Sequence, residues 1–383
     1  MDIQPFQIDI PEADLVDLRD RLARTRLPPV MDAIGWDEGC DPATLDRVLD
    51  DWLHRFDWRA AERRLNAQPQ FIADVDGMHV HLVHAQGKGP APMPIVITHG
   101  WPGSFVEMGR LTSLLADPGA HGADPADAFT VVVPSLPGFG YSPAPARPGI
   151  GQREVADTWV SLMAGLGYHR FAAQGGDIGA GVSSWMALRH PDAVIGTHLN
   201  FIPGSYRPPL GAGEPPVSGE EQAFLDRSAA WTNAEGGYAH VHGTKPQSLS
   251  PALTDSPAGL LAWMLEKFHG WSGDPDRMLQ GDRLDEILTN VSLYWFRASM
   301  GPAMRMYVEG RKRPMHLTSE QRSPVPFAVA HFPHELPTPP RSWVERGFNV
   351  QRWTTMRAGG HFAAMEEPEA LAGDIRAFFR ALR

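Results

Sequence analysis

The chain has 383 residues, of which 43% are hydrophobic and 21% are charged, a balance typical of a globular protein with a sizeable core. Its length fits one large domain with an insertion, or two domains. The net charge of −11 argues against nucleic acid or an anionic membrane as a partner, because both favour a basic surface. A single cysteine, Cys40, rules out an internal disulfide and suits a reducing compartment.

The N-terminal segment lacks the basic start and apolar run of a signal peptide, and no stretch approaches the ~20 consecutive apolar residues of a membrane helix. We therefore expect a cytoplasmic protein with no membrane partner. Arginine greatly outnumbers lysine, and alanine, glycine and proline abound. This bias is typical of a GC-rich bacterial genome, and we prefer that interpretation to an arginine-specific function.

Residues 11 to about 70 are expected to be helical. Leu15, Leu18 and Leu22 recur at helical spacing, as do apolar residues between 45 and 52, and Pro28-Pro29 separates the two helices. Residues 71–84 then alternate in hydropathy around an Asp76-Gly77 turn, which predicts a hairpin.

From residue 94 onward, short apolar runs alternate with helical stretches. Residues 94–98, 129–134, 171–174 and 194–199 read as strands, with helices at 105–115, 153–166 and 180–189. This order predicts a mostly parallel, doubly wound α/β sheet. Proline-rich sequence then opens a mostly helical section, and strands return at 326–330 and 350–355. We divide the chain into an N-terminal helical segment that packs on a lid (1–70), a first part of the α/β core (71–203), a helical lid (204–310) and a second part of the core (311–383).

The motif Gly175-Gly-Asp-Ile-Gly179 lies between a predicted strand and a predicted helix, the context of a nucleophile elbow. Small residues two positions before and after the centre leave room for a tight turn with a strained central residue. Asp177 occupies the centre, where esterases carry serine. A glycine-rich turn that merely begins a helix is the structural alternative.

A second motif, His99-Gly-Trp-Pro-Gly-Ser104, follows the strand at 94–98. Hydrolases with a nucleophile elbow bring a backbone N–H to the nucleophile at this place. We expect the N–H groups of Trp101 and Ile178 to form an oxyanion hole, with Pro102 fixing the turn, for which a cis peptide bond is one solution.

His361 follows the last predicted strand and two glycines, in the chain order nucleophile, acid, histidine. It is the candidate general base. Glu335, beyond the strand at 326–330, is the preferred acid to orient it, and Asp192 is the rival.

His79, His81 and His84 share one short segment, but two histidines on one strand face lack a third ligand for zinc. We interpret them as exposed strand histidines.

These motifs, together with Pro134-Ser-Leu-Pro-Gly-Phe-Gly-Tyr-Ser142 and Gly359-Gly-His-Phe-Ala-Ala364, resemble the epoxide hydrolases of the microsomal type, which have the α/β-hydrolase fold. The resemblance runs nearly end to end and includes the N-terminal segment around Asp57-Trp-Arg59. It implies two lid tyrosines that hold the epoxide oxygen, matched here by Tyr238 and Tyr307. Tyr294 and Tyr206 are the alternatives.

The resemblance implies that Asp177 attacks an epoxide and forms an ester, which water activated by His361 then hydrolyses to a vicinal diol. No metal or other cofactor is needed.

The family's animal members commonly have tryptophan where this chain has Ile178. A haloalkane or haloacid dehalogenase also uses an aspartate nucleophile, but it must stabilise a halide, often with an indole N–H at that place. A catalytically silent ligand-binding protein of the same fold is a further alternative. A serine esterase is disfavoured, because the chain has no G-x-S-x-G sequence.

An aromatic-rich lid indicates a bulky hydrophobic or aromatic epoxide as the substrate, although the same residues suit a lid core: Trp231, Trp263, Phe268, Trp271 and Trp295. Water is the second reactant. Detoxification and natural-product biosynthesis both fit such a substrate, and a homodimer is one of the assemblies left open.

Overall fold

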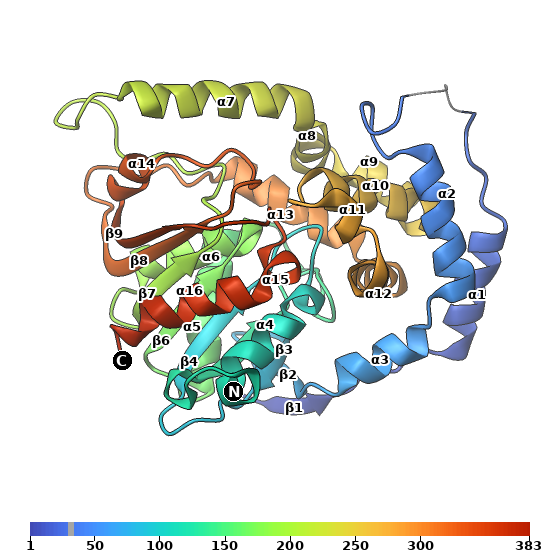
Figure 1. Ribbon diagram of the computed structural model, residues 1–383, viewed down its shortest axis with the longest axis horizontal. Coiled ribbons are helices and arrows are strands. Elements are labelled where there is room, and N and C mark those ends of the chain that lie inside the picture. Colours follow the sequence, from blue (N-terminus) through green and yellow to red (C-terminus); the bar gives the residue numbers. More distant parts are fainter. Residues whose placement is uncertain (30–33) are drawn as a thin grey trace.

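A nine-stranded sheet forms the centre of the protein (Figure 1), in a computed structural model that describes residues 1–29 and 34–383. Its strand order is β1-β2-β3-β5-β4-β6-β7-β8-β9. The strands are β1 (Ile3–Phe6), β2 (Gln70–Val75), β3 (Met78–Ala85), β4 (Met93–Thr98), β5 (Phe129–Pro134), β6 (Phe171–Gly175), β7 (Val194–Leu199), β8 (Ser323–His331) and β9 (Phe348–Thr355).

The sheet is parallel from β5 to β9 and antiparallel from β1 to β3. Every residue of β5 is buried, as expected for a continuous apolar strand that is covered on both faces. The hairpin between β2 and β3 turns at Asp76 and Gly77, both with positive φ. The edge strand β1 was not predicted, because four partly exposed residues carry no periodic signal of their own and are held by pairing with β2.

Helices cover both faces of the sheet. On one face α5 (Gln152–Gly165) packs against α6 (Asp177–Arg189), and on the other α16 (Pro368–Arg380) packs against α4 (Gly109–Ala116). The short helix α14 (Arg341–Glu345) connects the last two strands, and α15 (Ala363–Glu366) lies between β9 and α16. This layering produces the α/β architecture that the alternating pattern predicted.

Between β7 and β8 the chain forms a series of helices that lie above the sheet in Figure 1. They are α7 (Gly219–Glu235), α8 (Gly237–Thr244), α9 (Pro246–Asp255), α10 (Pro257–Gly270), α11 (Pro275–Met278), α12 (Gly281–Phe296) and α13 (Met300–Lys312). We call α7–α13 the lid. The insertion leaves the sheet after β7 and returns to it at β8, so one core is built from two distant parts of the chain.

The N-terminal helices α1 (Glu12–Ala23), α2 (Pro42–Asp50) and α3 (Trp58–Asn66) run along the side of the lid (Figure 1), with a π-helical turn at Asp51–Arg55 between the last two. The indole of Trp52 donates to Ser292 Oγ of α12 at 2.9 Å. Helix α1 ends well before Pro28, and residues 30–33 of the predicted helical stretch lie outside the described residues. The division into four folding units stays a prediction.

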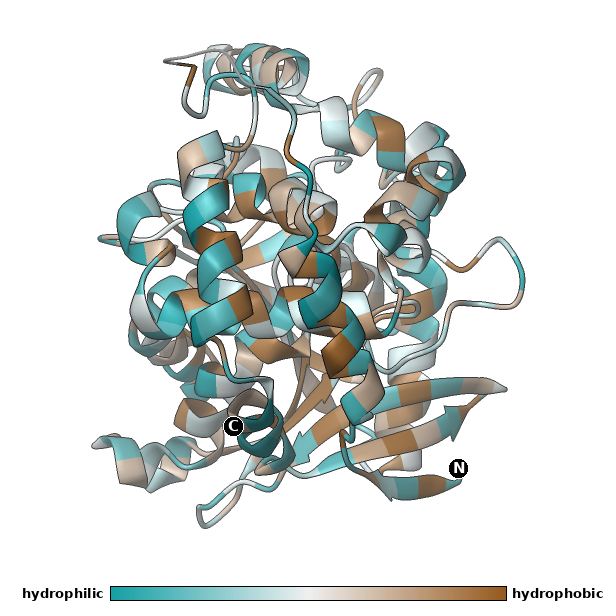
Figure 2. Ribbon diagram, turned by 90° about the vertical axis from the view of Figure 1, so that its right-hand side faces the viewer, coloured by the Kyte–Doolittle hydropathy of each residue, from teal (hydrophilic) through white to brown (hydrophobic). Residues whose placement is uncertain are grey.

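Hydrophobic residues concentrate in the strands behind the N-terminal helices, whereas the helices carry bands of both kinds (Figure 2). Helices α2 and α3 are amphipathic, because one face of each lies against the lid and the other faces solvent. Among the described residues, no helix is both long enough and apolar enough to cross a bilayer.

A buried carboxylate ties α16 to the sheet. Asp374 is only 5% exposed and accepts hydrogen bonds from Arg352 Nε (2.9 Å) and Thr354 Oγ1 (2.8 Å), while His198 Nε2 lies 3.0 Å away. Burial alone would raise the pKa of Asp374, but His198, Arg352 and Thr354 hold it well below its usual range. The network therefore stabilises the folded state as long as Asp374 is ionised.

Replacing Asp374 with asparagine should lower the free energy of unfolding by about 1.5–3 kcal/mol at neutral pH, because it removes the carboxylate to which Arg352 and Thr354 donate hydrogen bonds. The folded pKa lies below the unfolded value of about 4, so the stabilisation is complete above that pH and declines as the pH falls further. Urea unfolding at neutral and acidic pH would measure both effects. The exposed Asp192→Asn variant is the control, and an equal loss of stability in both variants would contradict the prediction.

Candidate active site

The predicted elbow is a sharp turn between β6 and α6. Asp177 lies at its centre with φ of 47°, a left-handed conformation that is costly for a residue with a side chain. The flanking glycines are required by close backbone contacts: a Cβ on Gly179 would lie 1.9 Å from the carbonyl oxygen of Thr98. One on Gly175 would lie 2.3 Å from the carbonyl oxygen of Gly179. The spacing of the two glycines around Asp177 is therefore required by close backbone contacts, as the motif predicted.

The loop after β4 lies directly against this turn. The backbone N–H of Trp101 donates to Asp177 Oδ1 at 2.9 Å, and a Cβ on Gly100 would lie 2.1 Å from the same oxygen. The Trp101–Pro102 peptide bond is cis. Ile178 is in the first turn of α6, where backbone N–H groups have no helical acceptor. The positive end of this helix also favours an anionic group at Asp177.

His361 and Glu335 complete the cluster. His361 Nδ1 lies 2.6 Å from Glu335 Oε1, and its Nε2 lies 3.3 Å from Asp177 Oδ2. Burial alone would lower the pKa of His361, but the carboxylates of Glu335 and Asp177 outweigh it and raise this pKa well above its usual value. The rival acid, Asp192, is exposed at the surface. The three residues meet although 184 positions separate the first from the last.

Tyr238 of α8 and Tyr307 of α13 lie over this cluster from the lid. The Tyr238 ring stacks on the indole of Trp101, with centroids 5.2 Å apart and an interplanar angle of 12°. The Tyr307 ring is 5.9 Å from that of Tyr238 and 6.0 Å from that of Trp101. Burial raises the pKa of both phenols well above the usual range, and the nearby Asp177 carboxylate raises the pKa of Tyr238 further. Both side chains are therefore protonated over the whole neutral range.

The two alternative tyrosines have other partners. The hydroxyl of Tyr294 donates to the carbonyl of Gly103 at 2.8 Å, from the last turn of α12. The hydroxyl of Tyr206 donates to the carbonyl of Trp343 at 3.2 Å, next to α14. Both therefore act as packing residues with a satisfied hydroxyl.

One prediction about the histidines was wrong. His81 is not an exposed strand residue but is completely buried, with Nδ1 at 2.8 Å from Ser135 Oγ and Nε2 at 2.9 Å from Gln70 Oε1. Burial lowers the pKa of His81 to about 3, so the ring is neutral. The alternation of residues within β3 could not reveal the burial of His81, because side chains from β1 and from the loop after β5 pack against its ring.

Comparison with known proteins gives a consistent result. The family model described as "Epoxide hydrolase N terminus" matches residues 3–108, and the one described as "alpha/beta hydrolase fold" matches residues 93–200. A protein of Stigmatella aurantiaca, provisionally named an epoxide hydrolase, is 40% identical over 100% of this chain and 86% of its own length. Epoxide hydrolase 1 of Oryctolagus cuniculus is 34% identical over 98% of this chain and 88% of its own. The chain belongs to the epoxide hydrolase family.

The solved structure of the Aspergillus niger epoxide hydrolase matches this epoxide hydrolase with a TM-score of 0.87 and 32% identity, covering 100% of this chain and 97% of that one. The resemblance seen in the sequence is therefore confirmed, and so are the α/β-hydrolase fold and the assignment as an enzyme. The roles of individual residues are a separate question.

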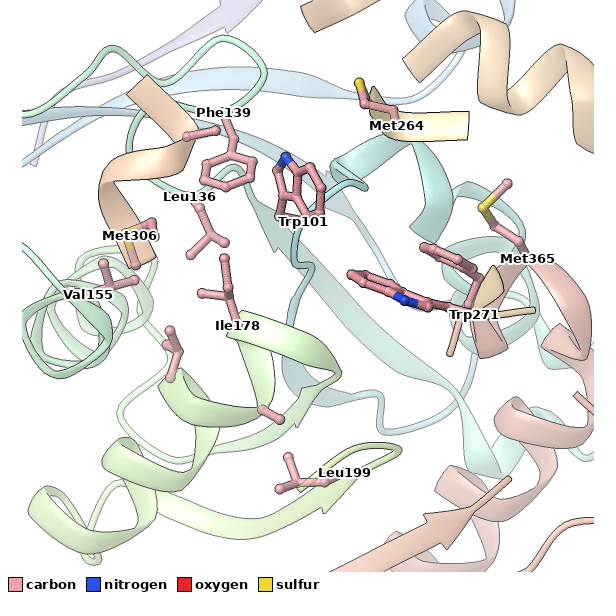
Figure 3. Close-up of a cluster of buried hydrophobic side chains, with 14 of the residues drawn as sticks. Trp101, Leu136, Phe139, Val155, Ile178, Leu199, Met264, Trp271, Met306 and Met365 are labelled. Atoms are coloured by element: carbon pink, nitrogen blue, oxygen red, sulfur yellow. The ribbon is translucent and has the colours of Figure 1, made fainter. Parts of the chain in front are cut away.

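Ile178 forms part of the wall beside the elbow in this epoxide hydrolase. Figure 3 shows its side chain pointing toward Leu136, with Phe139 and Trp101 beyond. The side chain is 6% exposed and belongs to the main core cluster. The core packing beside the elbow is therefore aliphatic at this position.

Lys267 and His242 were missed in the sequence, whereas Trp271 was named there as a lid aromatic without a place at the site. Trp271 packs edge-on against His361, with centroids 5.1 Å apart, and its carbonyl accepts the His361 backbone N–H at 2.9 Å. Lys267 is buried, with Nζ 4.6 Å from the centroid of the Tyr238 ring. His242, one turn after Tyr238 on α8, packs against Trp101. Only His242 had a local signal, its i+4 spacing from Tyr238.

Proposed function

We propose that this epoxide hydrolase converts a hydrophobic or aromatic epoxide to a vicinal diol through an ester on Asp177. The observation that carries the proposal is the environment of the Asp177 carboxylate. One oxygen accepts the Trp101 N–H at 2.9 Å, and the other lies 3.3 Å from His361 Nε2. A carboxylate held in this way at an elbow is oriented as a nucleophile, with a base beside it for a second step.

In the first step, a carboxylate oxygen of Asp177 attacks an epoxide carbon and the C–O bond of the ring breaks. Tyr238 and Tyr307 hydrogen-bond to the leaving oxygen, and one phenol gives it a proton. Their raised pKa keeps both phenols in the protonated form that this step needs. The product is a hydroxyalkyl ester on Asp177.

In the second step, His361 Nε2 takes a proton from water, and the water oxygen adds to the carbonyl carbon of the ester. Formation of the neutral ester removes one of the two carboxylates that raise the pKa of His361, so the imidazole more readily gives up its own proton and becomes the base. Glu335 orients the ring, and the N–H groups of Trp101 and Ile178 stabilise the oxyanion. When the intermediate breaks down, the C–O bond to the diol breaks and the imidazolium gives its proton to the departing diol oxygen. The remaining water hydrogen, which the new carboxyl group of Asp177 carries, passes to the phenolate, so that the Asp177 carboxylate and both phenols are restored.

The aromatic residues around the site support a hydrophobic substrate. Trp101, Tyr238 and Trp271 pack against one another above the elbow, and such surfaces favour apolar or aromatic groups. The dehalogenase alternative is less well supported, because the indole N–H of Trp101 is directed to Met300 Sδ at 3.3 Å and residue 178 has no indole. A silent ligand-binding protein is disfavoured, because each role in the scheme has a residue to fill it.

A single-turnover reaction in heavy-oxygen water, with enzyme in excess over an aryl epoxide, tests this mechanism. The diol should contain no heavy oxygen, because its new oxygen comes from Asp177, while the peptide that contains Asp177 should gain one heavy oxygen. Mass spectrometry of both products measures the outcome. A labelled diol with an unlabelled peptide would mean direct attack by water and would rule the ester out.

A further inference from the structure

The loop that carries His361 is packed against the lid by backbone atoms. A Cβ on Gly360 would lie 2.5 Å from the carbonyl oxygen of Trp271, and one on Gly273 would lie 2.8 Å from the backbone of the His361 loop. The backbone N–H of His361 donates to the same Trp271 carbonyl at 2.9 Å. Glycine at these two places therefore lets residues 271–273, which follow α10 and which we call the lid turn, contact the His361 loop directly.

One buried carboxylate bridges this junction. Glu366 is the last residue of α15 and is only 5% exposed. Its Oε1 accepts the backbone N–H groups of Gly360 at 3.0 Å and Phe362 at 3.1 Å, and its Oε2 accepts the backbone N–H of Gly273 at 2.6 Å. One oxygen thus holds the residue on each side of His361, and the other holds the lid turn.

The surroundings of Glu366 support its ionised form. Burial raises the pKa of Glu366, whereas its three backbone N–H donors and the guanidinium of Arg283 oppose that shift. Hydrogen bonds to an ionised carboxylate are about twice as strong as those between neutral groups. Arg283, from α12 of the lid, also donates to the Glu366 carbonyl at 2.5 Å. Both carboxylate oxygens are occupied by backbone donors, so an effect of Glu366 on the reaction must pass through His361 and not through a contact with substrate.

We propose that Glu366 is a positioning residue for hydrolysis of the Asp177 ester, because it locks the His361 loop to the lid turn. The imidazole of His361 is oriented by Glu335 at Nδ1, from the core, and by the ring of Trp271, from the lid turn. Glu366 holds these two halves of its surroundings together. A base displaced by about 1 Å can cost on the order of 10²-fold in rate. This inference rests on the proposed function and adds a residue to its second step.

Ester formation depends on other elements. The Asp177 carboxylate is held by the N–H of Trp101, from the loop after β4, and the two phenols come from α8 and α13. Within the described part of the chain, the Glu366 carboxylate accepts hydrogen bonds only from the His361 loop and the lid turn. The lid turn reaches the first step through one contact, between the rings of Trp271 and Tyr238 at 5.2 Å. Loosening the junction should therefore slow the second step far more than the first.

The Glu366→Gln variant tests the proposal with little change of shape, because an amide has only one acceptor oxygen. If that oxygen stays with Gly360 and Phe362, the NH₂ group faces the N–H of Gly273, donor against donor, and the link to the lid turn is lost. The opposite orientation gives up the two hydrogen bonds beside His361. Rapid-quench mass spectrometry with an aryl epoxide should show ester formation within about threefold of wild type and ester decay slowed by about 10- to 10²-fold.

Glu62→Gln is the matched control. Glu62 is also a buried carboxylate that accepts a backbone N–H, from Ile10 at 2.8 Å, but it lies in α3 of the N-terminal segment. Its replacement should lower the urea midpoint of unfolding, as Glu366→Gln should, and leave the rates of ester formation and decay at their wild-type values. The ratio of the two rates therefore separates positioning of His361 from a general loss of stability.

Unchanged ester decay in folded Glu366→Gln would overturn the proposal, as would an equal slowing of both steps or the same slowing of decay in Glu62→Gln. Should Glu366→Gln not fold, Glu366→Asp gives the same test, because the shorter side chain keeps its charge but withdraws from the lid turn and should slow decay alone. Absence of any ester in the wild-type enzyme would instead contradict the proposed function.

Discussion

His361→Gln should stop the reaction at the ester. The first step needs only the Asp177 carboxylate and the lid tyrosines, so the epoxide should still open at a measurable rate. The second step loses its base, and turnover should fall on the order of 10³-fold or more. Intact-protein mass spectrometry after mixing with an aryl epoxide should then show one substrate mass added to each chain, and digestion should place it on the peptide with Asp177.

Two further variants give this experiment its controls. Asp177→Ala should form no adduct and no diol, since the nucleophile is gone. Glu335→Gln should form the ester and hydrolyse it slowly, because the amide can still contact His361 Nδ1 but no longer supports a positive imidazole. Rapid turnover by His361→Gln, or an adduct on Asp177→Ala, would be incompatible with the two-step scheme.

Removing both lid hydroxyls should have the second largest effect, this time on ester formation. Tyr238→Phe and Tyr307→Phe should each slow this step by about 10- to 10²-fold, and the double variant by on the order of 10³-fold or more. In the double variant, the opening epoxide would develop an alkoxide in a buried site without a hydrogen-bond donor. In each single variant, the remaining phenol can still stabilise the alkoxide. Single-turnover rates of adduct formation, measured in the His361→Gln background, isolate this step from hydrolysis.

Tyr294→Phe is the matched control for the tyrosines. It removes a lid hydroxyl that donates to Gly103, so it should lower stability by about 1 kcal/mol and leave ester formation nearly unchanged. The assignment would fail if the double variant formed the ester at the wild-type rate. It would also fail if Tyr294→Phe were as slow as the double variant.

Ile178 lies next to the nucleophile, where the family resemblance implied tryptophan. Its backbone N–H serves the proposed oxyanion hole whatever the side chain is, whereas its side chain belongs to the wall with Leu136 (Figure 3). A change at this position should therefore alter which epoxides fit more than it alters the chemistry.

The local parts of the site were readable from the sequence. Gly175-Gly-Asp-Ile-Gly179 and His99-Gly-Trp-Pro-Gly-Ser104 are short stretches whose geometry depends on the residues within them. Glycine is needed where another backbone comes within about 2 Å of a Cβ position, and that requirement remains in the sequence as a motif. The alternation of apolar strands and helices likewise arises from burial on both sheet faces.

Other features depended on contacts between distant segments. Glu335 follows β8 whereas Asp192 lies between α6 and β7, and the packing of the loops after β8 and β9 brings Glu335 to 2.6 Å from His361. Four tyrosines were candidates, and the crossing of α8 and α13 above Trp101 selects two of them for the proposed site. A small cavity beside Asp177 has no sequence signal, because β6, the loops after β4 and β7, α15 and α16 each contribute a part of its wall.

The sequence by itself thus determined the fold class, the family resemblance and the turn that presents Asp177, because each is encoded in neighbouring residues or in a regular period. Only the tertiary structure decided which acid reaches His361 and which lid tyrosines lie over the elbow. Those answers depend on how separate elements of the chain pack together, and single side chains in a one-dimensional sequence do not specify their partners.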